Sequence, residues 1–171
     1  YEMGMAPTAM ERIITDFICQ KLGYDSKSNG FLTSGGTLAN LTALLSARKA
    51  KLSHNVWNEG HRERLGIMVS EEAHYCVDRA ARIMGLGDDG IIKIPANKDF
   101  ALDTKLLETY YQKAQNAGIK IFAIVGSAPS TSTGIFDDLE AIANFSQKHD
   151  LWFHVDGAHG GATILSKTYR Y

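Results

Sequence analysis

Two adjacent glycines stand directly before a run of residues with helical spacing, in the stretch Ser34-Gly35-Gly36-Thr37. Glycine weakens the interior of a helix or a strand, so a pair at this position needs a physical reason. A glycine-rich turn that opens a helix leaves several backbone N–H groups without partners, with the positive end of the helix dipole behind them. Such a turn is suited to bind an anion, for example a phosphate group. The alternative is a tight turn in which Thr37 only caps the helix.

A second group of candidate residues lies in the stretch HVDGAHGG, residues 154–161. His154 and Asp156 are two positions apart in a predicted strand, so they share one face of it. Asp156 stands at the carboxyl end of that strand, where an acid is costly to bury without a partner. It can face a cationic group of a ligand, or it can be a partly exposed acid at a strand end. A metal site formed by His154, Asp156 and His159 is the third interpretation.

Two further stretches follow predicted strands and could contribute to the same site. In SEEAHYCVDRA, residues 70–80, His74 comes just after a strand and near the start of a helix, although a lone histidine is more often structural or solvated. In SAPSTSTGIFDDL, residues 127–139, a loop rich in Ser and Thr could hydrogen-bond a ligand or stabilise a turn. In parallel sheets, ligands bind beyond the carboxyl ends of the strands, which is where both stretches fall.

Strands and helices alternate along the chain after Gly30. Apolar strands separated by amphipathic helices indicate a parallel sheet with right-handed crossovers. The predicted fold is therefore α/β, with three layers (α/β/α) and a mostly parallel sheet. Helices are predicted over residues 6–22, 38–51, 74–84, 103–118 and 137–147, strands over 66–70, 90–95, 119–126 and 151–156, and a loop or mobile insertion over 53–63. The apolar face of the first helix consists of Ile13, Ile14, Phe17, Ile18 and Leu22.

The composition is that of an ordinary soluble globular protein. The 171 residues are enough for one domain with a sizeable core, and they are 44% hydrophobic and 22% charged. A net charge of −1 gives no electrostatic reason to expect nucleic acid or an anionic membrane as a partner. No apolar run approaches the roughly 20 residues that a transmembrane helix needs. Cys19 and Cys76 show no paired-motif spacing, which favours reduced thiols in a cytoplasmic protein.

Taken together and in this order, the four stretches resemble the group II pyridoxal-phosphate-dependent amino acid decarboxylases, the family of the glutamate, diaminobutyrate and aromatic amino acid decarboxylases. TSGGTLANLTALLSAR resembles the family's phosphate-binding turn and the helix after it. SEEAHYCVDRAARIMG resembles the segment with the cofactor-stacking histidine, and HVDGAHGG resembles the family's HVDAA-type strand. The likeness runs from about Pro7 to Arg170. It implies the central part of the large domain of a fold-type I enzyme.

The resemblance also implies pyridoxal 5'-phosphate as the cofactor and a role for each matching residue. Gly36 and Thr37 match the positions that hold the cofactor's phosphate. His74 matches the histidine that lies flat on the pyridine ring, and Asp156 matches the acid that pairs with the pyridinium nitrogen, which makes these two the expected catalytic residues. No metal is expected. The implied cofactor-binding residues are Gly36, Thr37, His74, Thr131, Asp156 and Ala158, of which Ala158 packs under the ring and Thr131 places a hydroxyl near the ring's substituents.

The implied reaction is the decarboxylation of an amino acid, and its chemistry explains the acid. Loss of CO₂ leaves an electron pair on the substrate's α-carbon, and the cofactor's ring takes this pair up. The ring does so best with its nitrogen protonated, and a nearby carboxylate raises the pKa of that nitrogen. An aminotransferase or aldolase-type enzyme on the same fold is the alternative within the cofactor class. It is disfavoured by His74, because aminotransferases more often stack a Phe, Tyr or Trp there.

Two alternatives lie outside this cofactor class. A metal-dependent hydrolase would use His154, Asp156 and His159, and a non-catalytic α/β binding domain would use none of these residues for chemistry. The chain also departs from the resembled family at Pro129-Ser130-Thr131, where the family usually has Gly-Thr-Thr, and at Gly157 and His159, where relatives have Ala and often Tyr. Pro129 stiffens its loop, which is expected on the substrate side of the site, and removes a backbone N–H.

The lysine that holds the cofactor covalently follows the aspartate strand by roughly thirty residues in this family. Here the sequence continues for only 15 residues after Asp156, and Lys167 comes too early. We therefore expect residues 1–171 to form a single incomplete cofactor-binding large domain, without the N-terminal arm, the lysine segment and the C-terminal small domain. The piece alone should be inactive. For the parent protein the resemblance implies a small-molecule substrate, an amino acid, and a homodimer, because neighbouring subunits complete the site in this family.

Overall fold

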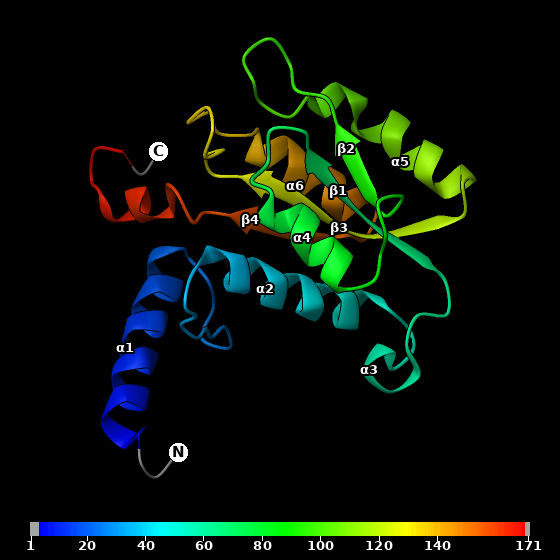
Figure 1. Cartoon of the computed structure of the whole chain (residues 1–171). Helices are drawn as coiled ribbons and strands as arrows, with labels where there is room; N and C mark the ends of the chain where they lie inside the picture. The colour runs from blue at the N-terminus through cyan, green and yellow to red at the C-terminus, as the bar shows by residue number, and fades with distance from the viewer. Residues whose placement is uncertain (1–3, 170–171) are drawn as a thin grey trace. The chain divides into compact units, whose positions relative to one another are not determined.

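The computed structural model describes residues 4–169, which divide into two compact units. The larger unit contains residues 36–161, and the smaller unit contains residues 4–35 together with 162–169. All strands of the described chain belong to the larger unit (Figure 1).

A four-stranded parallel sheet forms the centre of the larger unit (Figure 1). The strands are β1 (Arg64–Ser70), β2 (Ile91–Ile94), β3 (Ile119–Ser127) and β4 (Trp152–Asp156), and their order in the sheet is β2-β1-β3-β4. Each neighbouring pair is parallel, and the register places Ser127 of β3 opposite Asp156 of β4. The carboxyl ends of the strands therefore meet at one edge of the sheet.

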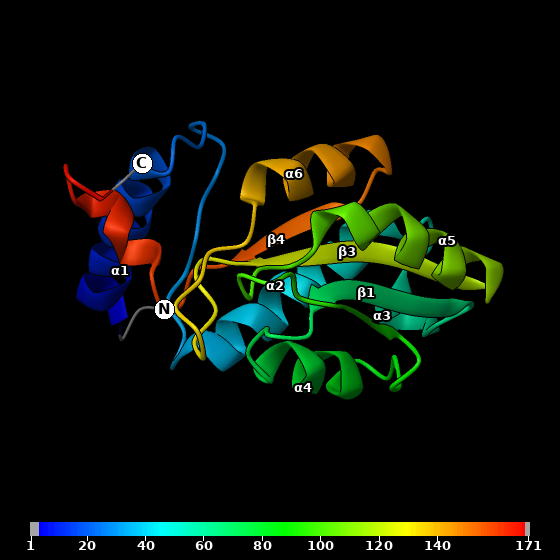
Figure 2. The ribbon, with the colours of Figure 1, turned by 90° about the horizontal axis from the view of Figure 1, so that it is seen from above.

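Helices cover both faces of the sheet, so the larger unit has three layers (Figure 2). The helices α2 (Gly36–Lys51) and α4 (Cys76–Ile83) pack on one face, and α5 (Leu107–Asn116) and α6 (Leu139–Lys148) pack on the other. Alternation along the strands divides the apolar side chains between two cores: Ile67 and Val69 of β1 face α2 and α4, while Met68 faces α5 and α6. The predicted α/β fold with a parallel sheet is confirmed.

Several element boundaries differ from the sequence-based prediction by a few residues. The helix α4 begins at Cys76, so His74 lies in the turn that precedes it. A short 3₁₀ turn, η2 (Thr104–Leu106), comes before α5, and the Asp103 carboxylate caps it by accepting the N–H of Lys105 at 3.1 Å. Asp138 is the residue that caps α6, because its carboxylate accepts the N–H of Ala141 at 3.0 Å.

Asp137 has a different task from its neighbour in sequence. Its side chain is buried, and its two carboxylate oxygens accept one backbone N–H each, from Leu102 at 2.7 Å and from Ser127 at 2.8 Å. Hydrogen bonds of this kind are what allow a carboxylate to be buried. Asp137 therefore ties the carboxyl end of β3 to the segment that precedes η2.

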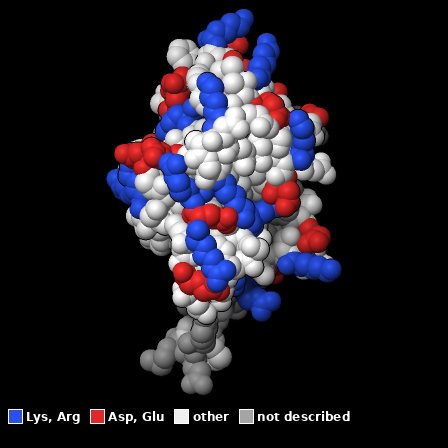
Figure 3. All heavy atoms as spheres, turned by 90° about the vertical axis from the view of Figure 1, so that its right-hand side faces the viewer, with Lys and Arg blue, Asp and Glu red and all other residues white. Residues whose placement is uncertain are grey.

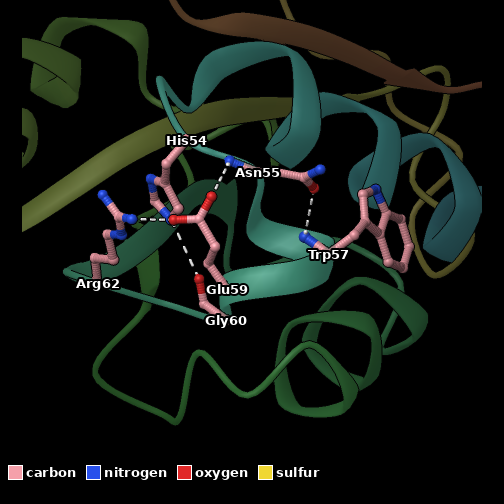
Figure 4. A network of polar contacts seen from close by, with 6 residues as sticks. All are labelled: His54, Asn55, Trp57, Glu59, Gly60 and Arg62. Atoms are coloured by element: carbon pink, nitrogen blue, oxygen red, sulfur yellow. Dashed lines mark hydrogen bonds and ion pairs between the residues drawn. The ribbon is translucent and has the colours of Figure 1, made fainter.

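The segment predicted as a loop or mobile insertion contains a short helix, α3 (Val56–Glu59), so that prediction is wrong for these four residues (Figure 4). The side chain of Asn55 caps this helix by accepting the N–H of Trp57 at 3.2 Å. In return, the Glu59 carboxylate accepts the backbone N–H of Asn55 at 3.2 Å and pairs with Arg62. This reciprocal arrangement satisfies N–H groups that the first turn of a helix leaves unpaired.

The smaller unit contains the predicted first helix, α1 (Met5–Lys21). Its helical periodicity is confirmed, but the apolar face is not buried in the described chain. Ile13 is 69% exposed and Phe17 is 47% exposed, whereas Thr15 is the buried residue of this helix. A large exposed apolar face on a helix is typical of a surface that another polypeptide covers.

Positive and negative side chains are interspersed over the face of the protein drawn in Figure 3. The described chain contains surface ion pairs, such as Lys148 with Glu108 at 2.8 Å and Lys120 with Glu63 at 3.1 Å. Exposed pairs of this kind contribute little to stability individually. Among the helices that the structure describes, none combines the length and the apolar content needed to cross a bilayer.

Replacement of Asp137 by Asn tests the tie at the end of β3. One oxygen acceptor would become an NH₂ group that faces a backbone N–H, so we expect Asp137→Asn to lower the free energy of unfolding by about 1–3 kcal/mol. Urea unfolding of the full-length protein measures the change. Asp138→Asn is the matched control, because Asn caps a helix about as well as Asp. Equal stability of the two variants would contradict this account of Asp137.

Candidate functional site

A cleft of about 260 Å³ lies in the larger unit between the first turn of α2 and the segments that follow β1, β3 and β4. All six residues predicted to bind the cofactor line it, although they come from four separate parts of the sequence: Gly36, Thr37, His74, Thr131, Asp156 and Ala158. Sequence reasoning did not select two other lining residues, Asn40 and Cys76, and it placed His159 only in the alternative metal site. The structure thus brings the predicted residues together, while their roles stay predictions.

The two glycines that open α2 have different physical reasons. Gly35 has a φ of +155°, a backbone conformation that residues with a side chain rarely adopt. A Cβ atom on Gly36 would lie 3.0 Å from the Cβ of Ala158, so only a glycine leaves this side of the cleft open. Because α2 begins at Gly36, Thr37 lies inside its first turn. The alternative interpretation of Thr37 as the N-cap is therefore wrong.

Asp156 occupies the last position of β4, where its carboxylate is half-buried at the cleft. One oxygen, Oδ1, accepts the backbone N–H of Ala158 at 3.1 Å. The other oxygen, Oδ2, accepts from the Nδ2 atom of Asn40 at 3.0 Å. Two donors from different elements therefore hold the carboxylate in one orientation, and each oxygen keeps a lone pair for a further partner.

His74 lies in the turn between β1 and α4, and its ring is half-buried at the cleft. The backbone N–H of Cys76 donates to Nδ1 of this ring at 3.3 Å. Since Nδ1 acts as an acceptor, a neutral His74 carries its proton on Nε2. The ring also contacts the ring of Tyr75, with 4.2 Å between centroids. These contacts fix the orientation of the imidazole.

Two titratable groups beside Asp156 are perturbed by burial. Burial raises the pKa of the Cys76 thiol, and a hydrogen bond from Asn40 opposes this in part. Burial lowers the pKa of His154, and the negative charge of Asp156 opposes this. Both groups therefore favour their neutral forms near neutral pH. The Asp156 carboxylate therefore has two neighbours that stay neutral.

The loop after β3 packs against the turn after β4. Gly160 leaves no room for a side chain, because its Cβ would lie 2.3 Å from Cδ of Pro129. The buried Ser130 donates its hydroxyl proton to the carbonyl oxygen of Glu72 at 2.8 Å, which ties this loop to the segment after β1. Thr131 follows as an exposed residue at the cleft. Pro129, which departs from the resembled family, thus has a packing role against Gly160.

The alternative metal site is not assembled. Among residues 4–169, no three His, Cys, Asp or Glu side chains lie close enough together to hold a metal ion. In particular, the Nε2 atom of His154 lies 2.6 Å from Oδ1 of Asn40 and is engaged there.

Comparison with known proteins identifies the family. Residues 2–171 match the family described as "Pyridoxal-dependent decarboxylase conserved domain". The chain belongs to this family. Its members use pyridoxal 5'-phosphate, and the family's description names a decarboxylase and none of the aminotransferase, aldolase-type or metal-hydrolase alternatives.

Similar curated proteins include two bacterial decarboxylases. The chain is 31% identical to L-2,4-diaminobutyrate decarboxylase of Acinetobacter baumannii, over 99% of this chain and 36% of that protein. It is 41% identical to aspartate 1-decarboxylase of Aliivibrio fischeri, over 84% of this chain and 29% of that protein. The chain therefore spans about a third of the length of these relatives.

A solved structure with the same fold is the glutamate decarboxylase domain of diaminobutyrate-pyruvate transaminase and L-2,4-diaminobutyrate decarboxylase from Vibrio parahaemolyticus. It superposes with a TM-score of 0.92 at 37% identity, over 98% of this chain and 38% of that one. Mouse CSAD in its apo form superposes with a TM-score of 0.94 at 31% identity, over 99% of this chain and 36% of that one. The fold-type I assignment is confirmed by these structures.

The burial of Cys76 predicts a slow reaction with alkylating reagents. The thiol is 2% exposed and its pKa is raised, so little thiolate is present and access is poor. We expect iodoacetamide at pH 8 to modify Cys76 at least about 10-fold more slowly in the native protein than in urea. Peptide mass spectrometry of the full-length protein measures this, with the half-buried Cys19 as an internal reference. Equal rates for Cys76 in both conditions would refute its burial.

Proposed function

We propose that the protein to which this chain belongs decarboxylates an amino acid with pyridoxal 5'-phosphate as cofactor, and that this chain supplies most of the non-covalent cofactor site. The observation that carries the proposal is the convergence of the six predicted residues on one cleft. The cleft also fits the cofactor. The first turn of α2 offers N–H groups for a phosphate, Gly36 leaves space beside Ala158, and the Asp156 carboxylate supplies the negative charge that a pyridinium requires.

Each residue has a distinct task in this proposal. The bound cofactor supplies an electron sink for the electron pair left on the substrate when CO₂ departs. Asp156 accepts a hydrogen bond from the ring nitrogen and holds a proton there. His74 covers one face of the ring and excludes water from it. Gly36 and Thr37 bind the phosphate at the first turn of α2, while Asp156 binds the ring, so the two ends of the cofactor are held by different elements.

We propose that the substrate is an amino acid, whose identity depends on residues outside the cleft described above. A screen of the full-length protein for CO₂ release should use L-2,4-diaminobutyrate, L-aspartate, L-glutamate and aromatic amino acids. The two curated relatives named above are an L-2,4-diaminobutyrate decarboxylase and an aspartate 1-decarboxylase, which is why these two compounds come first. Release of CO₂ from none of them, in the presence of pyridoxal 5'-phosphate, would count against the proposed reaction.

We propose further that residues 1–171 are part of a larger cofactor-binding domain and that the lysine for covalent attachment lies elsewhere in the protein. Lys167 is exposed and belongs to the smaller unit, and it is not among the residues that line the cleft. A cytoplasmic location is also proposed, and the free state of Cys19 and Cys76 supports it.

We propose that the full-length protein is a homodimer in which the exposed apolar face of α1 is buried. Ile13, Phe17 and Leu22 are 69%, 47% and 46% exposed, which is costly in water unless a partner covers them. Ile13→Glu should therefore shift the protein toward the monomer, and sedimentation velocity measures the shift. The matched control is Glu11→Gln on the same helix. A wild-type protein that sediments as a monomer at micromolar concentration would disprove the dimer.

The role of Asp156 predicts a large kinetic effect from a small structural change. Asp156→Asn removes the negative charge that keeps the ring nitrogen protonated, so we expect kcat/KM to fall by about 100-fold or more, or about 2.7 kcal/mol, while the protein stays folded. CO₂-release assays of the full-length protein measure kcat/KM, and circular dichroism measures folding. The control is Asp138→Asn, which changes a carboxylate outside the cleft. Turnover near the wild-type value in Asp156→Asn would argue against the assigned role.

A further inference from the structure

Asn40 is a buried polar residue that lines the cleft, and the cofactor-binding roles proposed above do not include it. It lies on the second turn of α2 and is 4% exposed. Its Nδ2 atom is 3.0 Å from Oδ2 of Asp156 and 3.2 Å from Sγ of Cys76. Its Oδ1 atom is 2.6 Å from Nε2 of His154. The two amide hydrogens and the carbonyl oxygen of this side chain therefore all have partners.

These partners determine which way the amide faces. A carboxylate can only accept hydrogen bonds, so the NH₂ group of Asn40 must face Asp156. The carbonyl oxygen then faces His154, and the Nε2 atom of that ring must carry a proton in order to donate to it. Asn40 thus selects one tautomer of a neutral His154 and places a fixed donor against the carboxylate of Asp156.

A second branch of the same network reaches the histidine on the cleft. The Asn40 amide donates to Sγ of Cys76, and the backbone N–H of Cys76 donates to Nδ1 of His74. Asn40 therefore connects the segment that carries His74 with the strand that carries Asp156. These two residues are the ones expected to contact the cofactor's ring.

We infer that Asn40 is a positioning residue that aims the Asp156 carboxylate at the cofactor's ring nitrogen. The inference rests on the proposed function, because it assigns to Asn40 an effect that is exerted through Asp156. The second donor to that carboxylate, the N–H of Ala158, holds Oδ1 only. Without Asn40, the carboxylate keeps one anchor and can rotate, and the donor group of His154 loses its acceptor.

A double-mutant cycle in the full-length protein tests this inference. Asn40→Leu keeps the branching at Cγ and removes all three hydrogen bonds, and we expect kcat/KM to fall by about 10-fold to about 100-fold. The dissociation constant of pyridoxal 5'-phosphate for the apoprotein, measured by fluorescence quenching, should rise by about 10-fold. Ser46→Ala, an exposed position on the same helix that bonds only within it, is the matched control.

The decisive readout is the effect of Asn40→Leu in a protein that already carries Asp156→Asn. If Asn40 acts through Asp156, its replacement should cost less than about 3-fold in that background, for both kcat/KM and the dissociation constant. Additive losses in the two backgrounds would overturn the inference and leave Asn40 with a purely structural role. If Asn40→Leu does not fold, Asn40→Ser takes its place in the cycle, because a hydroxyl leaves room for water but does not reach Asp156.

The single variants separate this inference from the proposed function. Asp156→Asn with wild-type kcat/KM and cofactor affinity would reject the proposed function itself. A strong loss in Asp156→Asn together with wild-type values in both Asn40→Leu and Asn40→Ser would reject only the positioning role of Asn40.

Discussion

The register between β3 and β4 is the constraint on which the candidate site depends. Ser127 pairs with Asp156 at the carboxyl ends of these strands, and the N–H of Ala128 donates to the carbonyl oxygen of Asp156 at 2.9 Å. A slip of one residue in a strand turns each side chain to the opposite face of the sheet. Asp156 would then leave the cleft. The buried carboxylate of Asp137 accepts the N–H of Ser127, the residue that pairs with Asp156, and so holds the end of β3 in place.

The start of α2 and the end of β4 form two walls of the same cleft. A side chain on Gly36 would press against Ala158, so the small size of both residues keeps the walls apart. The Asn40 amide spans the same gap and reaches Asp156. The small residues set the spacing between the two walls, and one hydrogen-bonded amide joins them. Together they hold the Asp156 carboxylate at a set distance from the first turn of α2.

Much of the fold and of the site could be predicted from the sequence, because the signals are local. Apolar strands alternate with amphipathic helices, and the glycine pair and Asp156 stand where an α/β sheet binds its ligands. The Asn55 cap of α3 was a readable signal in a polar segment, with Glu59 in position to bond back to it. The exposure of the apolar face of α1 was not predictable, because periodicity identifies a face but not what covers it.

Asn40 shows why the remainder of the site was missed. In the run LANLTALL it reads as a polar position on an exposed helix face, although it lies four residues before the fully buried Leu44 and hence on the same side of α2. A polar residue at a core position is a signal that something must satisfy it. Its partners come from β4 and α4, which lie far away in sequence, so only the folded chain reveals them.

The most direct test of the central claim is an experimental structure of the full-length protein with pyridoxal 5'-phosphate bound. The account predicts the phosphate at the backbone N–H groups of Gly36 and Thr37, with the ring nitrogen hydrogen-bonded to the carboxylate of Asp156 and the ring under His74. A cofactor bound at another place, or a ring nitrogen that faces away from Asp156, would contradict it.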